Sequence, residues 1–109
     1  MHELSITRNI VATVKEHAAG RPVQAIQLQI GRLSGIEIQS IRFCFDLCAR
    51  GTELEGARLE IDEVPGRGAC EECGEVLPLE QLVLRCPCEK RAPLKIIAGE
   101  ELLIKWMEV

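Results

Sequence analysis

Residues 66–88 read GRGACEECGEVLPLEQLVLRCPC, and they contain four of the six cysteines in this chain of 109 residues. These cysteines form two short pairs, a Cys-x-x-Cys at Cys70 and Cys73 and a Cys-x-Cys at Cys86 and Cys88. Four thiolates on two turns suit zinc, which prefers tetrahedral sulfur coordination at about 2.3 Å. The spacing therefore predicts a structural zinc site. Because four thiolates close the coordination sphere, we expect no catalysis there.

The same cysteines allow two other interpretations, a redox pair and thiols without a shared role. A redox Cys-x-x-Cys is expected to open a helix after a strand, whereas Cys70 follows the segment PGRG at residues 65–68, which we interpret as a linker. A second cysteine pair, separated from the first by twelve residues, favours zinc. Its shorter turn directs fewer backbone N–H groups at sulfur, so we expect the geometry of the site to differ from that of two Cys-x-x-Cys turns.

The regions around the cysteines show helical and strand patterns. Apolar residues recur at helical spacing over residues 3–19 and again over about residues 37–50. They alternate with polar residues over 23–30 and 57–64, which predicts strands with one buried face. Residues 101–109 are apolar on both sides, so we expect a strand that is well covered by its surroundings.

This order of elements predicts an α+β fold. Two amphipathic helices cannot bury their apolar stripes alone, so they should lie on a small three-stranded sheet. The last strand completes that sheet, which makes the cysteine module an inserted zinc-ribbon-like lobe. We therefore predict an α/β domain of residues 1–65 and 94–109 and a zinc-binding domain of residues 66–93.

Composition excludes several classes of function. The chain is 47% hydrophobic and 28% charged, as is ordinary for a globular protein. Its net charge of -4 argues against nucleic acid as the main partner. No apolar run approaches the ~20 residues that span a membrane, and the first residues do not resemble a signal peptide. We therefore expect a cytoplasmic protein, in which cysteines bind metal or remain buried thiols.

The remaining candidate residues point to structure rather than catalysis. The only histidines are His2 and His17, so no Ser/His/Asp set is available, and no P-loop is present. We therefore expect no enzyme. Cys44 and Cys48 lie on the apolar stripe of the second helix, where a free cysteine acts as a small hydrophobe. Trp106 is expected to pack, and His17 to be a solvated residue at a helix end.

The chain opens with Met1, His2 and Glu3 directly before a helix. Position alone is weak evidence for a ligand role of His2, because a histidine near a terminus is usually solvated. However, a free α-amine, ionisable backbone amides and an imidazole form a nitrogen-rich set. Nitrogen donors in a square plane suit Ni(II) or Cu(II).

Several stretches together resemble the HypA/HybF family of nickel metallochaperones. They are MHELSI at the start, IGRLSG at residues 30–35, RFCFDL at 42–47, GTELEGARLEIDEVPGRGAC at 51–70, the two cysteine pairs, and GEELLIKWMEV at the end. The resemblance covers essentially the whole chain. Family members usually have Cys-Pro-x-Cys at the second pair, and this chain is one residue shorter there.

The resemblance implies a carrier that delivers nickel to the large subunit precursor of [NiFe]-hydrogenase together with a nickel-handling, HypB-like GTPase. It also implies a nickel site built from the amine of Met1, the imidazole and amide of His2 and the amide of Glu3. The four paired cysteines become the ligands of a structural zinc ion. The alternative is a zinc-ribbon protein-interaction or nucleic-acid-binding module with no nickel role, which accounts for the cysteines but not for the acidic charge or the Met-His-Glu start.

Overall fold

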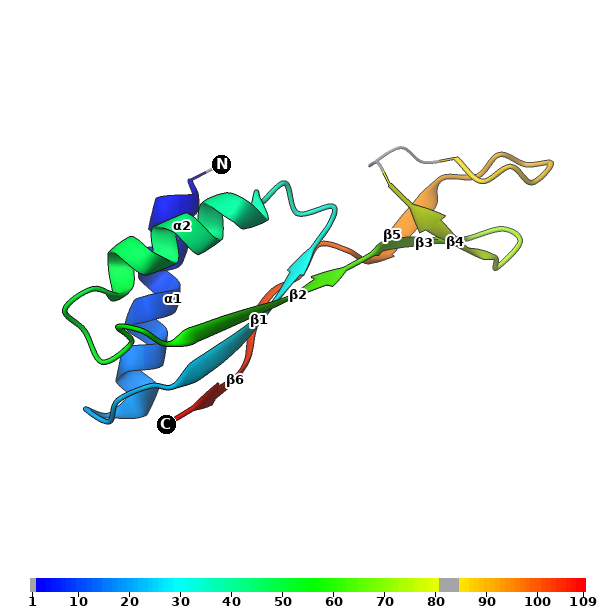
Figure 1. Ribbon diagram of the computed structural model, residues 1–109. Coiled ribbons are helices and arrows are strands. Elements are labelled where there is room, and N and C mark those ends of the chain that lie inside the picture. Colours follow the sequence, from blue (N-terminus) through cyan, green and yellow to red (C-terminus); the bar gives the residue numbers. More distant parts are fainter. Residues whose placement is uncertain (1, 81–84) are drawn as a thin grey trace.

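The computed structural model describes residues 2–80 and 85–109, which form an elongated molecule of 57 × 22 × 17 Å with two sheets (Figure 1). The elements in chain order are α1 (Glu3–Ala18), β1 (Ala25–Gly31), α2 (Ile38–Ala49), β2 (Arg58–Val64), β3 (Gly66–Cys70), β4 (Val76–Leu79), β5 (Leu94–Ala98) and β6 (Leu102–Glu108). Both helices lie on the first sheet, and the second sheet extends from its far end (Figure 1). Within the described residues, no helix combines the length and apolarity needed to cross a bilayer.

The first sheet has the strand order β2-β1-β6. β1 runs parallel to β2, because α2 forms the crossover between them, and antiparallel to β6. The central strand alternates as the sequence predicts, with Ile26, Leu28 and Ile30 buried and Gln27 and Gln29 half-buried. The prediction of an α+β fold with two helices on a three-stranded sheet is confirmed.

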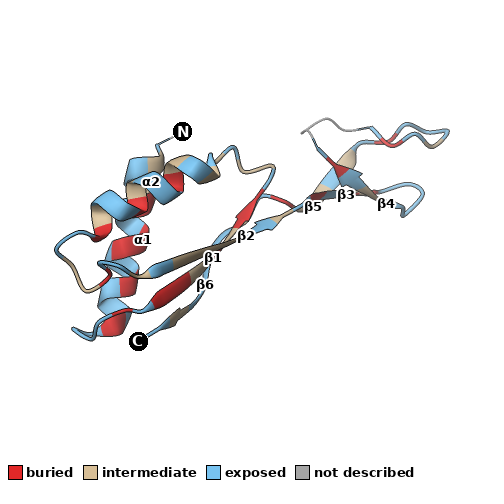
Figure 2. Ribbon diagram, viewed as in Figure 1, coloured by how far each residue is buried: buried red, intermediate tan, exposed pale blue. Residues whose placement is uncertain are grey.

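The main hydrophobic core lies between the two helices and this sheet (Figure 2). Its buried members are Ile10, Val11, Val14, Ala18, Val23, Ile26, Leu28, Ile30, Ile41, Phe45, Ala49 and Leu54. Burial of apolar surface stabilises by about 25 cal/mol per Å², so this core is the main source of stability for the first lobe. We use "first lobe" for α1, α2 and the sheet β2-β1-β6.

The N-terminal ends of the two helices are tied together. The Glu37 side chain caps α2 by accepting a hydrogen bond from the Gln39 backbone N–H at 3.0 Å. The Glu37 backbone N–H in turn donates to Oε2 of Glu3 at 3.3 Å. The carboxylate of the first helical residue of α1 therefore helps to position the start of α2.

The second sheet has the strand order β4-β3-β5 and is antiparallel throughout. Its central strand covers residues 66–70, so the prediction of a linker at residues 65–68 was wrong. Gly68 is placed there by close packing, because a Cβ at this position would lie 2.7 Å from the Leu79 side chain. We use "second lobe" for this sheet and the cysteine turns. It includes residues 94–98, which the sequence analysis assigned to the α/β domain, and the division into two domains stays a prediction.

The two lobes meet at a tightly packed junction after β1. A Cβ on Gly31 would overlap the carbonyl oxygen of Gly99, and a Cβ on Gly99 would lie 2.6 Å from Cα of Gly66. The Leu33 N–H donates to the Gly99 carbonyl at 2.7 Å. The loop after β1 thus holds both chain segments that connect the lobes.

Strand β6 is far more exposed than expected. Leu103 is 51% exposed, Leu102 40% and Trp106 37%. The prediction of a well-covered strand was wrong because β6 is an edge strand, paired only with β1. Apolar residues on both faces show that a strand can bury both faces, and they do not show that other elements cover it. Cys44 and Cys48 are likewise only half-buried on α2.

Candidate metal sites

The first cysteine pair lies where β3 ends. Cys70 is the last residue of β3, and a tight turn follows in which the Gly74 N–H donates to the Cys70 carbonyl at 3.0 Å. Gly74 has a φ of 77°, a left-handed conformation that favours glycine. The Cys73 N–H points at Sγ of Cys70 at 3.4 Å. The turn therefore brings the Cys73 side chain back beside that of Cys70.

The second pair is held by its own turn. The Cys86 N–H donates to the Ala92 carbonyl at 2.9 Å, and the Arg91 N–H donates to the Cys88 carbonyl at 3.0 Å. Arg91 has a positive φ of 46°, which lets the chain reverse within this short segment. The Cys-x-Cys turn thus directs both of its thiols toward the first pair, despite being one residue shorter than a Cys-x-x-Cys.

The four sulfur atoms fit a single tetrahedral metal ion. All four lie within 4.8 Å of one another. Sγ of Cys70 is 3.9 Å from that of Cys88, and Sγ of Cys73 is 3.6 Å from that of Cys86. A tetrahedron with metal–sulfur bonds of about 2.3 Å has edges of about 3.8 Å. The cluster therefore fits structural zinc. A zinc ion bound here would cross-link the two cysteine turns.

The thiols of Cys70, Cys86 and Cys88 differ in acidity. The Cys73 backbone N–H, which points at the Cys70 sulfur, lowers the pKa of Cys70 to about 7. The Cys88 backbone N–H also lowers the pKa of Cys86, but burial and the other three thiols outweigh it and raise that pKa to about 12. The Ala92 backbone N–H lowers the pKa of Cys88. Without metal, protons are therefore shared unevenly in the cluster, and a bound cation must displace the proton of Cys86.

The second candidate site is the N-terminus. Met1, one of its predicted ligands, lies outside the described residues. His2 is exposed and directly precedes α1, and its side chain makes no capping hydrogen bond. Glu3 is half-buried, and its carboxylate points to the start of α2. Within the described residues, no third ligating side chain joins His2 and Glu3 in a cluster.

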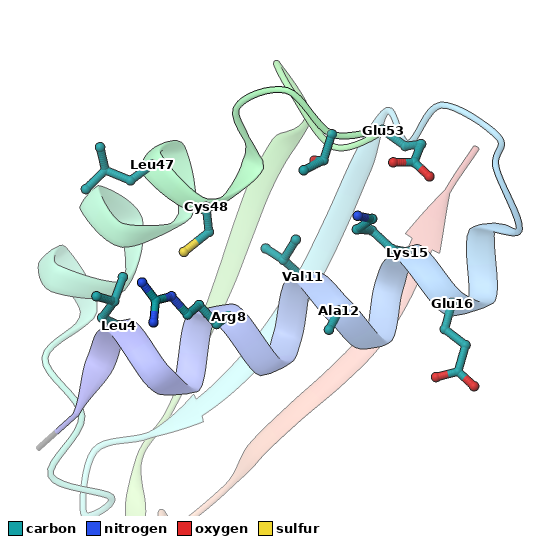
Figure 3. A pocket seen from close by; sticks show the side chains of 10 residues that line it. Leu4, Arg8, Val11, Ala12, Lys15, Glu16, Leu47, Cys48 and Glu53 are labelled. Carbon is teal, nitrogen blue, oxygen red and sulfur yellow. The ribbon is translucent and has the colours of Figure 1, made fainter.

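Two open grooves adjoin the N-terminus. One, of about 640 Å³, is lined by residues 2–5 of the chain's start and by four residues of α2 that include Phe43 and Cys44. The other, of about 790 Å³, lies between α1 and α2, where Arg8 and Lys15 line it beside apolar side chains (Figure 3). Sequence reasoning placed Cys44 only on an apolar stripe. Its position beside His2 depends on how the helices pack, which helical periodicity does not encode.

The fold and the cluster define the class first: a small two-lobed α+β protein with a four-cysteine metal site. Comparison with known proteins then identifies the family. A family model described as "Hydrogenase/urease nickel incorporation, metallochaperone, hypA" matches residues 1–109, and the chain belongs to the HypA family.

Similar proteins agree with this assignment. The hydrogenase maturation factor HypA of Rippkaea orientalis is 53% identical over 109 residues, covering 100% of this chain and 96% of that protein. The corresponding protein of Geobacter sulfurreducens is 46% identical, with 100% and 99% coverage. The solution structure of the nickel metallochaperone HypA from Helicobacter pylori matches with a TM-score of 0.70 at 23% identity, covering 100% of this chain and 97% of that one. That structure shares the fold.

The family handles nickel for hydrogenase maturation, and the four-cysteine cluster suits zinc, so both predicted metals are supported.

Proposed function

We propose that this chain carries Ni(II) at its N-terminus and holds zinc as a structural ion. The nickel ligands are the amine of Met1, the imidazole and amide nitrogens of His2 and the amide nitrogen of Glu3. The zinc ligands are the four clustered cysteines. Membership of a nickel-incorporation family supports the nickel role over a zinc-ribbon interaction or nucleic-acid-binding module.

The observation that carries the nickel site is the start of α1. The first hydrogen bond of the helix runs from the Ile6 N–H to the His2 carbonyl, so the helix leaves the amides of residues 3–5 unused. An amide nitrogen binds Ni(II) only after it loses its proton, and an amide that donates no hydrogen bond loses it more readily. His2 is exposed beside these amides. The site therefore combines free nitrogen donors with open access for an acceptor.

Glu3 contributes to this site through its backbone. Its carboxylate accepts the hydrogen bond from the Glu37 N–H at 3.3 Å and is directed at α2. We therefore expect Glu3→Gln to bind nickel nearly as tightly as the unaltered chain, because the amide nitrogen remains.

The acceptor that we propose is the large subunit precursor of [NiFe]-hydrogenase, and the proposed helper is a nickel-handling GTPase. The family is defined by nickel incorporation into hydrogenase or urease, and the similar proteins are hydrogenase maturation factors, which supports a hydrogenase acceptor. An exposed site suits transfer, because an acceptor can add its ligands one at a time. On this proposal the chain is a cytoplasmic carrier without turnover, and any nucleotide hydrolysis belongs to the GTPase.

Calorimetric titration with Ni(II) tests the proposal. The unaltered chain should bind one nickel ion, and affinity should fall as pH drops, because protons compete for the nitrogen donors. His2→Ala should abolish high-affinity binding without changing zinc content. His17→Ala is the matched control. In the unaltered chain, Nδ1 of His17 is hydrogen-bonded to the Thr13 carbonyl at 2.9 Å, and the variant should bind nickel normally.

Acetylation of the α-amine should weaken nickel binding in the same titration. If His2→Ala binds nickel as tightly as the unaltered chain, the N-terminal site is refuted, and the cysteine cluster becomes the leading nickel candidate.

A further inference from the structure

We propose that Cys73 is the site at which peroxides oxidise this protein, and that Cys86 completes a disulfide with it and so releases zinc from the cluster. This reaction requires the zinc site proposed above, and it does not involve the nickel site. The four cysteines are equivalent as zinc ligands, but the chain places them in different surroundings.

Access to solvent separates Cys73 from the other three cysteines. Cys73 is exposed, whereas Cys70 and Cys86 are each 3% exposed and Cys88 is half-buried. Cys73 lies in the turn between β3 and β4, and its neighbours on both sides are exposed as well. A small reagent in solution therefore reaches the sulfur of Cys73 first.

Backbone hydrogen bonds make the same distinction. Sγ of Cys70 accepts the Cys73 N–H at 3.4 Å. The sulfurs of Cys86 and Cys88 also accept backbone N–H groups, from Cys88 and from Ala92. From residues 2–80 and 85–109, no backbone N–H donates to the Cys73 sulfur. A hydrogen bond to a thiolate stabilises its charge, so Cys73 presents the most reactive sulfur of the cluster.

Zinc binding preserves this difference. A thiol that coordinates zinc is deprotonated, and the thiolate is the form of cysteine that acts as a nucleophile. All four ligands are therefore thiolates in the loaded cluster, and their acidities no longer decide which one reacts. Access and hydrogen bonding decide it, and both favour Cys73.

The reaction proceeds in two steps. The Cys73 thiolate attacks one oxygen of hydrogen peroxide and breaks the O–O bond, which gives a sulfenic acid on Cys73 and a hydroxide ion. The Cys86 thiolate then attacks Sγ of Cys73, which forms the S–S bond and displaces a second hydroxide. Two electrons pass from the two thiolates to the peroxide, and two protons from solvent convert the hydroxides to water.

Cys86 is placed to carry out the second step. Its sulfur lies 3.6 Å from that of Cys73, so a small movement of the exposed turn brings the two atoms into bonding distance. The disulfide takes two of the four ligands that a structural zinc site needs, and the cluster then loses its metal. Because Cys73 and Cys86 belong to different turns, the disulfide keeps the two turns cross-linked.

Limited alkylation of the zinc-loaded chain tests which cysteine reacts. A Cys44→Ser, Cys48→Ser background removes the two free thiols of α2. Less than one equivalent of N-ethylmaleimide, followed by peptide mass spectrometry, should label Cys73 about ten times more than each other ligand, because exposure governs the modification of thiolates. Absence of zinc from the unaltered chain would refute the zinc site itself. Zinc in place with first labelling at another ligand would refute only the reactivity of Cys73.

One equivalent of hydrogen peroxide tests the second step in the same background. A chromogenic zinc chelator should report the release of one zinc ion as two thiols are lost. Peptide mapping without reduction should find Cys73 joined to Cys86, and dithiothreitol followed by zinc should restore the loaded cluster. Zinc release in which the first disulfide joins other cysteines, or in which none forms, overturns the inference.

Two matched variants separate the reactive residue from the loss of a ligand. Cys73→His and Cys88→His each leave three cysteines and one histidine, a ligand set that is common in structural zinc sites. Cys73→His should slow the release of zinc by peroxide about tenfold, because the exposed thiolate is gone. Cys88→His keeps Cys73 and should release zinc at nearly the unaltered rate. Equal rates in the two zinc-loaded variants would contradict the role of Cys73.

Discussion

The two lobes of this protein are held together in different ways. The first lobe has a core cluster of twelve buried residues, which come from both helices, the central strand and, with Val23 and Leu54, the connecting segments. Among the described residues of the second lobe, the buried cluster consists of Cys70, Cys86 and Ala92, and two of these belong to the metal cluster. Leu79 of β4 is buried as well, against Gly68. Apolar residues elsewhere in the second lobe face solvent, such as Ile97 at 49% exposure. The first lobe therefore has a core large enough to fold by hydrophobic burial, whereas we expect the second to depend on a metal cross-link, as small lobes with little core usually do.

The strongest test of this comparison removes one sulfur. Cys73→Ser changes an exposed side chain and leaves no cavity. We expect loss of zinc and of fixed structure in the second lobe, with the first lobe intact. Metal analysis and amide hydrogen exchange on the same sample measure both. Cys44→Ser, a free thiol in the first lobe, is the control and should keep its zinc. Persistence of an ordered second lobe without zinc would show that its small core suffices.

A second test uses pH. Zinc binds thiolates, so affinity falls as pH drops and protons compete. The Cys86 thiol, with a pKa raised to about 12, must lose its proton to zinc throughout the neutral range. Cys70, with a pKa lowered to about 7, adds a further proton only below that pH. Chelator competition from about pH 8 to about pH 6 should therefore show a slope that steepens below about 7, while the first lobe keeps its hydrogen-exchange protection. A slope that is uniform across this range would contradict the uneven acidities.

A third test weakens the first lobe alone. Leu28 is 1% exposed at the centre of the core. Leu28→Ala should lower the free energy of unfolding of this lobe by about 2–5 kcal/mol, through lost burial and a cavity. Leu103→Ala on the exposed strand should cost less than about 0.5 kcal/mol. Urea denaturation followed by circular dichroism measures both, with zinc content unchanged. Equal effects of the two substitutions would argue against the burial assigned to them.

The smallest effect is expected at the start of α2. Glu37→Ala removes the cap on the Gln39 N–H and should lower the stability of the first lobe by about 1 kcal/mol. Glu37→Gln keeps an acceptor oxygen and should cost less. The same urea titration resolves the difference. Loss of zinc from Glu37→Ala would be the surprising result, since it would couple the two lobes.

Much of the fold was predictable because its signals are local. Helical spacing over residues 3–19 and alternation over 23–30 reflect which faces meet the core, and α1 and β1 follow them closely. The cysteine cluster was predictable for a related reason, since two short turns confine each pair of sulfurs. The structure brings all four together within 4.8 Å. The nickel role of Met1, His2 and Glu3 rests on resemblance and stays a prediction.

Local sequence patterns predicted the helices, the strands of the first sheet and the two cysteine turns, because each depends on side-chain periodicity or on turns of a few residues. The packing of distant segments, by contrast, makes residues 66–70 a central strand and leaves β6 as an exposed edge. A glycine-rich segment has the same sequence whether it is a linker or a strand packed too closely for a Cβ. An apolar strand likewise shows the same pattern whether or not another element covers it. Both outcomes depend on which distant segments lie alongside, and periodicity along the chain carries no record of that.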